Sequence, residues 1–215
     1  MTMQSRSFLW ALALLSLGAC APTGQTGGVP LAEVARPEVS IAASALRDDQ
    51  AQIAALTDAI LAMGPGVDPE ESARAARVTY VSVAELRAAY QITDGPMIHN
   101  MKVNSGIKPR GLCWHWALDL EARLQAEGFR TLDLHQAIAN YNNLRLEHST
   151  AIVSAKGASM YDGIVLDPWR DGGVLTWKAV RADTRYNWTP RAEVFDWKRA
   201  RGLLKTRYVE LAEGR

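Results

Sequence analysis

The chain has 215 residues, with 24 basic and 23 acidic side chains, so its formal net charge is only +1. A chain whose charges nearly cancel has no overall positive field, which argues against a nucleic-acid-binding protein. We find no internal repeat, so a solenoid or an array is not expected either.

The first twenty residues have the layout of a bacterial signal peptide. MTMQSR carries a positive charge, FLWALALLSL is apolar, and LGAC follows at residues 17–20. An apolar run of about ten residues is well short of the roughly 20 that a spanning helix needs. LGAC resembles the lipobox of bacterial lipoproteins, in which the cysteine is acylated and becomes the new N-terminus. We therefore predict a signal peptide over residues 1–19 and a lipid on Cys20, with an ordinary secretory signal as the alternative.

Residues 20–38 contain much Gly, Pro and Thr and few large apolar side chains, as in a flexible spacer. The remaining residues, 39–215, are enough for one domain with its own core. An acylated Cys20 would tether this domain to a membrane through its buried methylenes. The expected location is the cell envelope, facing the periplasm, and Ala21 favours the outer membrane if the enterobacterial sorting rule applies.

The pattern changes along the domain from helices to strands. The expected helices ahead of residue 111 have apolar residues at helical spacing or a cap, such as the capping box of Ser82 and Glu85. The later segments are short, alternating and rich in β-branched residues. Helices followed by strands indicate an α+β fold, with an antiparallel sheet packed on one side by a cysteine-bearing helix. The helices are expected over residues 41–63, after Asp68 and over residues 82–90, and the strands over residues 131–139, 147–155 and 161–167.

Cys113 lies at the expected start of a helix that covers residues 112–127 and ends at Gly128. The unpaired N–H groups and the dipole at a helix N-terminus favour an anion, and thiols placed there are more acidic than a free thiol. This position predicts a nucleophilic thiolate. A buried structural cysteine is the alternative, because free Cys is among the most buried residue types.

A cysteine nucleophile needs a base, and the chain has four histidines. His115 points away from the thiol on a helix and has Asp119 four residues on, so we expect a surface ion pair. His99 is expected in a loop before the helix, where it caps or lines a cleft, and His135 is expected in a strand as a core or sheet-face residue. His148 is different because it opens a strand.

Asp167 closes another strand, and Pro168 ends it. If the two strands pair as a hairpin, His148 and Asp167 become cross-strand neighbours, and the period of two allows both side chains to lie on the same face. The sequence therefore predicts that His148 and Asp167 lie close together on the sheet.

The order GLCWHWA, EHSTAIV and VLDPW resembles the transglutaminase-like branch of the papain-type cysteine peptidase superfamily, over roughly residues 95–170. The resemblance implies a transglutaminase-like core in which Cys113 is the nucleophile, His148 the general base and Asp167 the group that orients the imidazole. The family often has an aromatic residue soon after the histidine and a small residue after Asp-Pro, whereas this chain has Ser149-Thr150 and Trp169. These differences leave the three residues in place and the substrate class open.

In the expected reaction, the thiolate attacks an acyl carbonyl and backbone N–H groups at the helix start hold the oxyanion. Asn104 is a candidate second oxyanion donor, with a role in a turn as its alternative. The aromatic residues Trp114, Trp116 and Trp169 are candidates for the wall of a cleft, or else for the core. We expect no cofactor and assign no metal site.

The function is therefore predicted to be that of a lipid-anchored cysteine hydrolase or acyltransferase, acting on a peptide, protein or peptidoglycan-type substrate. Water as the acceptor gives a peptidase or amidase, and an amine gives a transferase. A non-catalytic envelope module with the same fold is the alternative. Residues 176–207 hold nine Lys or Arg against three acids, with Trp residues between them. Such a stretch is usually a solvated face, or else one that touches anionic lipid.

Overall fold

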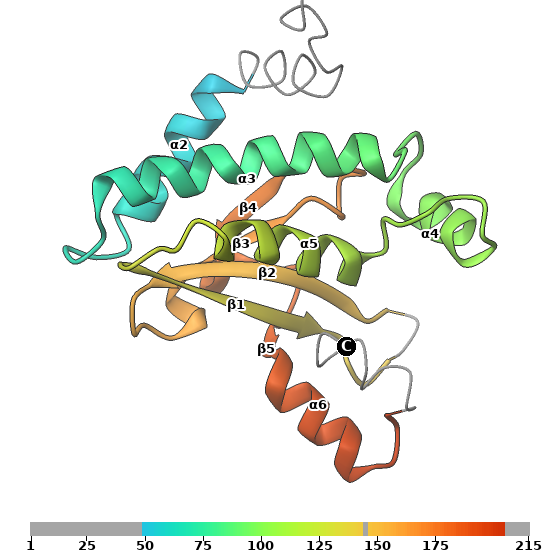
Figure 1. Cartoon of the computed structure of the whole chain (residues 1–215). Coiled ribbons are helices and arrows are strands. Elements are labelled where there is room, and N and C mark those ends of the chain that lie inside the picture. Colours follow the sequence, from blue (N-terminus) through green and yellow to red (C-terminus); the bar gives the residue numbers. More distant parts are fainter. Residues whose placement is uncertain (1–48, 144–145, 205–215) are drawn as a thin grey trace, which may run out of the picture. The chain divides into compact units, whose positions relative to one another are not determined.

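The computed structural model describes residues 49–143 and 146–204, all within one compact unit that spans Ala35–Arg215. The lipobox, Cys20, the linker and the first part of the expected helix 41–63 lie outside the described residues. The fold is α+β (Figure 1), as the sequence predicts. The helices are α2 (Gln50–Leu61), α3 (Pro69–Ala89), α4 (Pro96–Asn104), α5 (Cys113–Gln125) and α6 (Arg191–Ala200). The strands are β1 (Leu132–Ala139), β2 (His148–Ala155), β3 (Ile164–Asp167), β4 (Thr176–Ala179) and β5 (Thr189–Pro190).

Helix α3 begins where the sequence predicts, because the Asp68 carboxylate accepts hydrogen bonds from the backbone N–H groups of Glu70 and Glu71. The expectation of a separate helix over residues 82–90 is wrong. Ser82 is buried inside α3 and caps nothing, and Glu85 instead forms an ion pair with Arg123. No Gly or Pro interrupts residues 70–89, so the helix continues through the apparent cap.

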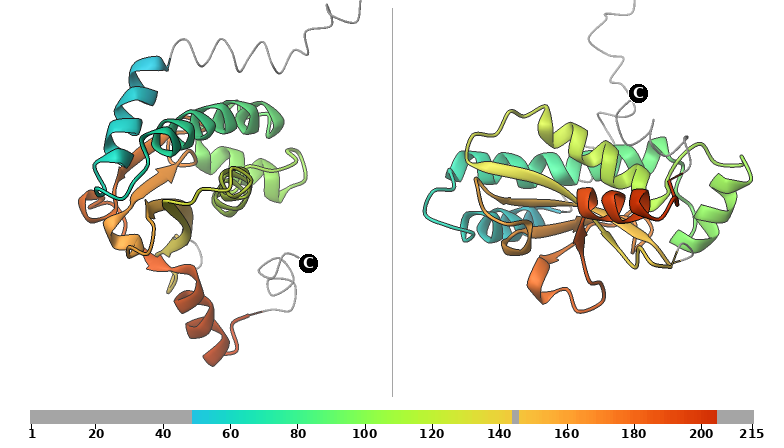
Figure 2. Two further views of the ribbon diagram at one scale, coloured as in Figure 1. Left: turned by 60° about the vertical axis from the view of Figure 1, so that its left-hand side comes forward. Right: turned by 90° about the horizontal axis from the view of Figure 1, so that it is seen from below.

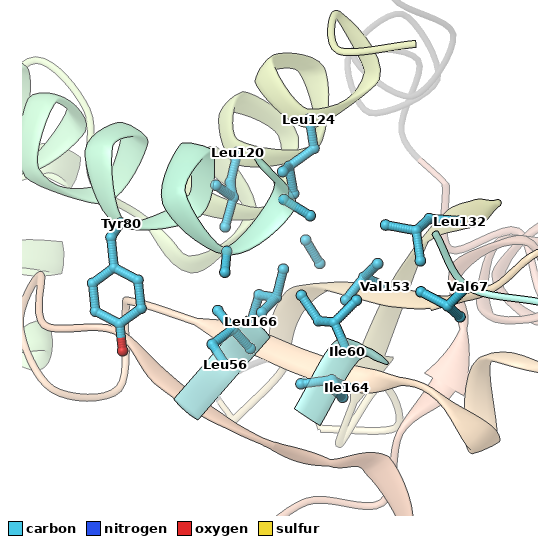
Figure 3. Packing of buried hydrophobic residues seen from close by; sticks show 13 residues of the cluster. Leu56, Ile60, Val67, Tyr80, Leu120, Leu124, Leu132, Val153, Ile164 and Leu166 are labelled. Carbon is cyan, nitrogen blue, oxygen red and sulfur yellow. The ribbon is translucent and has the colours of Figure 1, made fainter. Parts of the chain in front are cut away.

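The five strands form one antiparallel sheet in the order β4-β3-β2-β1-β5. Helices α2, α3 and α5 cover one face (Figures 1 and 2), as expected for the cysteine-bearing helix. The main core lies between these helices and the sheet (Figure 3), and α5 contributes Leu120 and Leu124 to it. Helix α6 packs near β1 and β5 on the other side of the sheet (Figure 1).

The alternation of side chains along β2 and β3 decides where the site can form. Ala151 and Leu166 belong to the core under the helices, whereas Ile152 and Val165 pack on the opposite face with Trp188. Because side chains alternate with a period of two, His148 and Asp167 belong to the same face as Ile152 and Val165. The pairing of β2 with β3 therefore places both side chains on one face, as predicted.

Gly163, just before β3, provides a test of this pairing. A Cβ added there would come closer than 3.0 Å to the backbone carbonyl oxygen of Val153, which is a strand neighbour that cannot easily move. We expect Gly163→Ala to lower the free energy of unfolding by about 1–3 kcal/mol, as overpacking does. Urea denaturation measures this change.

The matched control is Gly66→Ala, because a Cβ at Gly66 meets nothing within 4 Å. Its effect should stay within about 0.5 kcal/mol, as for other open surface positions. Equal stability of the two variants would mean that the β2–β3 edge adjusts without cost.

Candidate active site

Cys113 is the first residue of α5 and a free thiol, half-buried at the end of the sheet where β2 begins. Its Sγ lies 3.9 Å from the carbonyl oxygen of Glu147, the residue before His148. The helix ends near Gly128, which has a φ of 63°. The predicted position of the cysteine at a helix N-terminus is therefore confirmed, and the same contact places it beside the start of β2.

A tight turn ahead of Cys113 depends on a histidine. His99 is buried and lies in α4, so its expected place in a loop is wrong. Its Nε2 is 2.8 Å from the carbonyl oxygen of Arg110. Gly111 has a φ of 119°, and a Cβ on it would come within 2.7 Å of the His99 ring carbon Cδ2. Only glycine combines this backbone angle with such a close approach, so His99 and Gly111 together fix how the chain enters α5.

His115 is not the surface ion-pair partner that its spacing to Asp119 suggested. It is buried, and its Nδ1 accepts hydrogen bonds from the backbone N–H groups of Gly111 (3.1 Å) and Leu112 (3.2 Å). Asp119 instead binds Arg110 at 2.8 Å and the Tyr90 hydroxyl. The reason is that N–H groups at a helix start have no acceptor within the helix, and the third residue of the helix can fold its ring back to them.

Burial lowers the pKa of His115 to about 4, and the neighbouring Arg110 cation adds to this effect. A ring whose Nδ1 accepts two N–H donors must be neutral, with its proton on Nε2. His115 is therefore a cap of the cysteine-bearing helix and not a base for the thiol.

His148 and Asp167 form the hydrogen bond that the strand pattern predicts. The His148 Nε2 is 2.6 Å from Asp167 Oδ2, and both side chains are about 98% or more buried. The register pairs Ala151 with Leu166, so His148 lies diagonally from Asp167 and not directly opposite. A diagonal neighbour on the same face is still within reach of a long side chain.

The protonation of this pair follows from its surroundings. Burial alone lowers the pKa of His148, but the hydrogen bond to Asp167 and the nearby Cys113 sulfur outweigh it and raise the pKa to about 9. Burial alone raises the pKa of Asp167, but His148 and Arg170 bring it below its ordinary value. His148 Nδ1 is buried without another hydrogen-bond partner in the described part of the chain. With Nε2 held by Asp167, Nδ1 is the nitrogen that remains for Cys113.

Three aromatic rings enclose the imidazole. The ring centroids of Trp169, Tyr186 and Trp188 lie 4.6, 4.7 and 5.4 Å from that of His148. Trp169 is itself held by a hydrogen bond of 3.0 Å from its Nε1 to Asn100 Oδ1. These contacts restrict the imidazole to one plane. Trp169 therefore contacts the candidate base, and so does Trp188, although the composition of its stretch predicted a solvated or lipid-contacting face.

The other predicted site residues divide into three cases. Trp116 is buried against Tyr90 in the core, at 4.7 Å between ring centroids, so it does not line a cleft. Trp114 is half-buried, with its ring 3.8 Å from that of His115. Asn104 is exposed at the last residue of α4, and no hydrogen bond joins it to Cys113 or His148 in the described ranges. The structure therefore gives no support to Asn104 as an oxyanion donor and leaves the helix N–H groups for that role.

Two charged residues at the site were missed by sequence reasoning. Arg170 donates from Nε to Asp167 Oδ2 at 2.8 Å, and its terminal nitrogens bind both oxygens of Asp183. The guanidinium side chain is only 4% exposed and the Asp183 side chain is fully buried. The spacing of Arg170 three residues after Asp167 was a possible signal, but Asp183 lies in a loop whose path the sequence pattern does not reveal.

His135 lies in β1 and its Nε2 is 2.8 Å from Ser154 Oγ, which is the expected sheet-face position. Within residues 49–143 and 146–204, no three His, Cys, Asp or Glu side chains come together in a way that suits a metal ion. In the same ranges, none of the helices combines the length and the apolar character needed to cross a bilayer.

Comparison with known proteins adds no relative: the chain matches no family model, no curated protein and no solved structure.

The cap formed by His115 gives a test that depends on pH. Because the folded-state pKa of about 4 lies below the ordinary 6.5, the unfolded chain takes up the proton first, and stability present above pH 6.5 is lost as the pH falls toward 4. His115→Ala loses the cap, so we expect it to be about 1 kcal/mol less stable than wild type near neutral pH. The wild type alone loses up to about 3 kcal/mol on acidification, so the difference should vanish near pH 6 and be reversed at pH 4.5.

Urea denaturation at a series of pH values measures this crossing. His135→Ala is the control, because it removes a half-exposed imidazole from the sheet face and leaves the cap of α5 intact. Parallel stability curves for wild type and His115→Ala would contradict the assignment of His115 as a neutral buried cap.

Proposed function

We propose that the protein is a cysteine hydrolase or acyltransferase of the cell envelope, with Cys113 as nucleophile, His148 as general base and Asp167 as the group that orients the imidazole. One observation carries the proposal. A buried His148–Asp167 hydrogen bond of 2.6 Å leaves His148 Nδ1 without a hydrogen-bond partner in the described part of the chain, and the Cys113 thiol at the start of α5 contacts Glu147, the residue before His148. A nucleophile, a base and a group that orients the base are the three parts that such catalysis requires.

The reaction follows from these positions. The proton of the Cys113 thiol passes to His148 Nδ1, and the sulfur forms a bond to the acyl carbonyl carbon. The N–H groups at the start of α5 stabilise the oxyanion, since the N-terminus of a helix carries partial positive charge. The protonated His148 then gives its proton to the leaving group, and an acyl-enzyme remains. Water releases the acid, whereas an amine as acceptor gives transfer.

The arrangement agrees with the resemblance to transglutaminase-like domains, since Cys113 begins a helix and His148 and Asp167 lie on adjacent antiparallel strands. We propose this assignment for the domain. The lipobox-like LGAC motif supports a lipid anchor on Cys20 and a position in the envelope, facing the periplasm. A peptide, a protein or a peptidoglycan-type amide is the substrate class that fits this chemistry and location.

The triad is tested by the rate of Cys113 alkylation by iodoacetamide as a function of pH, which needs no known substrate. Imidazolium stabilises thiolate, so wild type should react well below pH 8, where an ordinary thiol with a pKa of about 8.5 is mostly protonated. His148→Ala should lose this low-pH reactivity. Asp167→Asn keeps the shape but favours the wrong tautomer, a change that has cost up to about 10⁴ in rate in comparable triads.

His135→Ala is the matched control, since His135 lies on the same sheet but bonds only Ser154 among the described residues. Cys113→Ala reports alkylation at other sites. If the low-pH reactivity survives in His148→Ala, the triad is excluded and the non-catalytic module becomes the better description.

The anchor is tested separately by metabolic labelling with a palmitate analogue. Wild type should be labelled and recovered with membranes, whereas Cys20→Ser should lose the label because the acceptor sulfur is gone. Cys113→Ala is the control and should be labelled like wild type. Equal labelling of Cys20→Ser and wild type would remove the lipoprotein assignment without affecting the triad.

A further inference from the structure

The charged side chains behind His148 form a buried row that extends past the triad. Asp167 Oδ2 accepts from His148 Nε2 at 2.6 Å and from Arg170 Nε at 2.8 Å. Arg170 reaches Asp183 with two further bonds of 3.2 and 2.7 Å. The charges therefore alternate along the row, which runs from an imidazole that can be positive to a carboxylate, a guanidinium and a second carboxylate.

Asp183, at the far end of this row, is also connected to His148 through an aromatic ring. Asp183 accepts a hydrogen bond of 3.0 Å from Trp188 Nε1, and the Trp188 ring lies against His148. Tyr186 contacts both rings, at 4.7 Å from His148 and 5.1 Å from Trp188 between centroids, and the Arg170 guanidinium carbon lies 4.9 Å from the centre of the Tyr186 ring. A change at Asp183 therefore has two routes to the imidazole, one through charge and one through the aromatic rings.

The shared oxygen gives Arg170 and Asp183 an effect on the site that an ordinary structural ion pair does not have. His148 and Arg170 both donate a hydrogen bond to Asp167 Oδ2. The electrostatic stabilisation of protonated His148 by Asp167 therefore depends on how strongly Arg170 interacts with the same atom. Asp183 binds the terminal nitrogens of Arg170 and so offsets part of its charge. In a buried site such interactions are screened only weakly.

We propose that Arg170 and Asp183 are positioning residues that set how firmly Asp167 holds protonated His148, and thereby the pH range in which Cys113 is reactive. This inference rests on the proposed function for its consequence, but the electrostatic coupling is a property of the folded chain.

The other groups that face His148 are few among the described residues. Cys113 approaches it from α5, and Tyr186 is a neutral phenol whose pKa burial raises further. Glu147, next to His148 in the chain, is paired with Lys198 of α6 at 2.5 Å. Arg185 contacts the ring of Tyr186, with its guanidinium carbon 5.5 Å from the ring centre. Asp167 and, through it, Arg170 and Asp183 are therefore the charges whose alteration should move the His148 titration most.

The experiment uses two variants with opposite expected signs. In Asp183→Asn the carboxylate that offsets the Arg170 charge is lost. Arg170 then attracts Asp167 more strongly, and Asp167 stabilises protonated His148 less. The low-pH limb of Cys113 alkylation should move up by about one pH unit, which is roughly a tenfold slower rate on that limb. In Arg170→Met/Asp183→Asn both charges are removed, Asp167 acts on His148 alone, and the limb should move to lower pH.

The double variant also guards against misfolding, because removing a whole buried ion pair is often tolerated, whereas removing one partner is not. Urea denaturation establishes that each variant is folded. The matched control is Asp162→Asn, which makes the same change in an Arg–Asp pair whose Asp162 side chain is 55% exposed, and it should leave the limb where it is. Should Asp183→Asn fail to fold, the double variant alone decides.

A second readout separates this inference from the proposed function. The His148 titration is followed by NMR in the Cys113→Ala background, where no thiol chemistry takes place. Movement of the titration to lower pH with Asp183→Asn and to higher pH with the double variant supports the coupling even if alkylation shows no triad. Folded variants that titrate like their parent, or that both move in the same direction, would show that Arg170 and Asp183 serve stability only.

Discussion

A carboxylate stays ionised inside a protein only where positive charge and N–H donors surround it, and Asp167 is in that position. His148 and Arg170 donate to one oxygen, and the backbone N–H groups of Trp169 and Arg170 donate to the other. The rest of the site follows from this requirement. The strand that carries Asp167 must end where it does, the chain must turn back at once, and His148 must lie on the same face of the sheet.

The local patterns of the sequence predicted the elements that carry the three site residues, because each had a short-range cause. The helix that begins at Cys113, the strands that carry His148 and Asp167, and their common face all follow from spacing and alternation. Where two local signals competed, prediction failed. Ser82 resembles a cap, yet no Gly or Pro interrupts the chain there, and the burial of that face extends α3 through it.

The residues that sequence reasoning missed or misplaced owe their roles to contacts between distant segments. His115 had Asp119 at helical spacing, but the unpaired N–H groups ahead of it were the stronger partners. Trp188 and Asp183 lie in a stretch that is basic overall, and nothing in its composition shows that it folds against His148. A composition describes the average of a segment, whereas a buried partner depends on where one particular side chain points.

Helix α3 has a mechanical consequence. Its 21 residues extend about 32 Å and are fixed at both ends. Near its start the Glu71 carboxylate accepts from the backbone N–H of Thr131 ahead of β1, and near its end the Arg87 side chain lies against Gly173 in the loop that follows Asp167. A force applied at residue 49 would act on α2 first and would shear the apolar contacts between α2 and α3. The hydrogen-bond ladder of β2 and β3 would carry little of the load until α2 had peeled away, so a domain held from its N-terminal side could bear tension without losing the alignment of its strands.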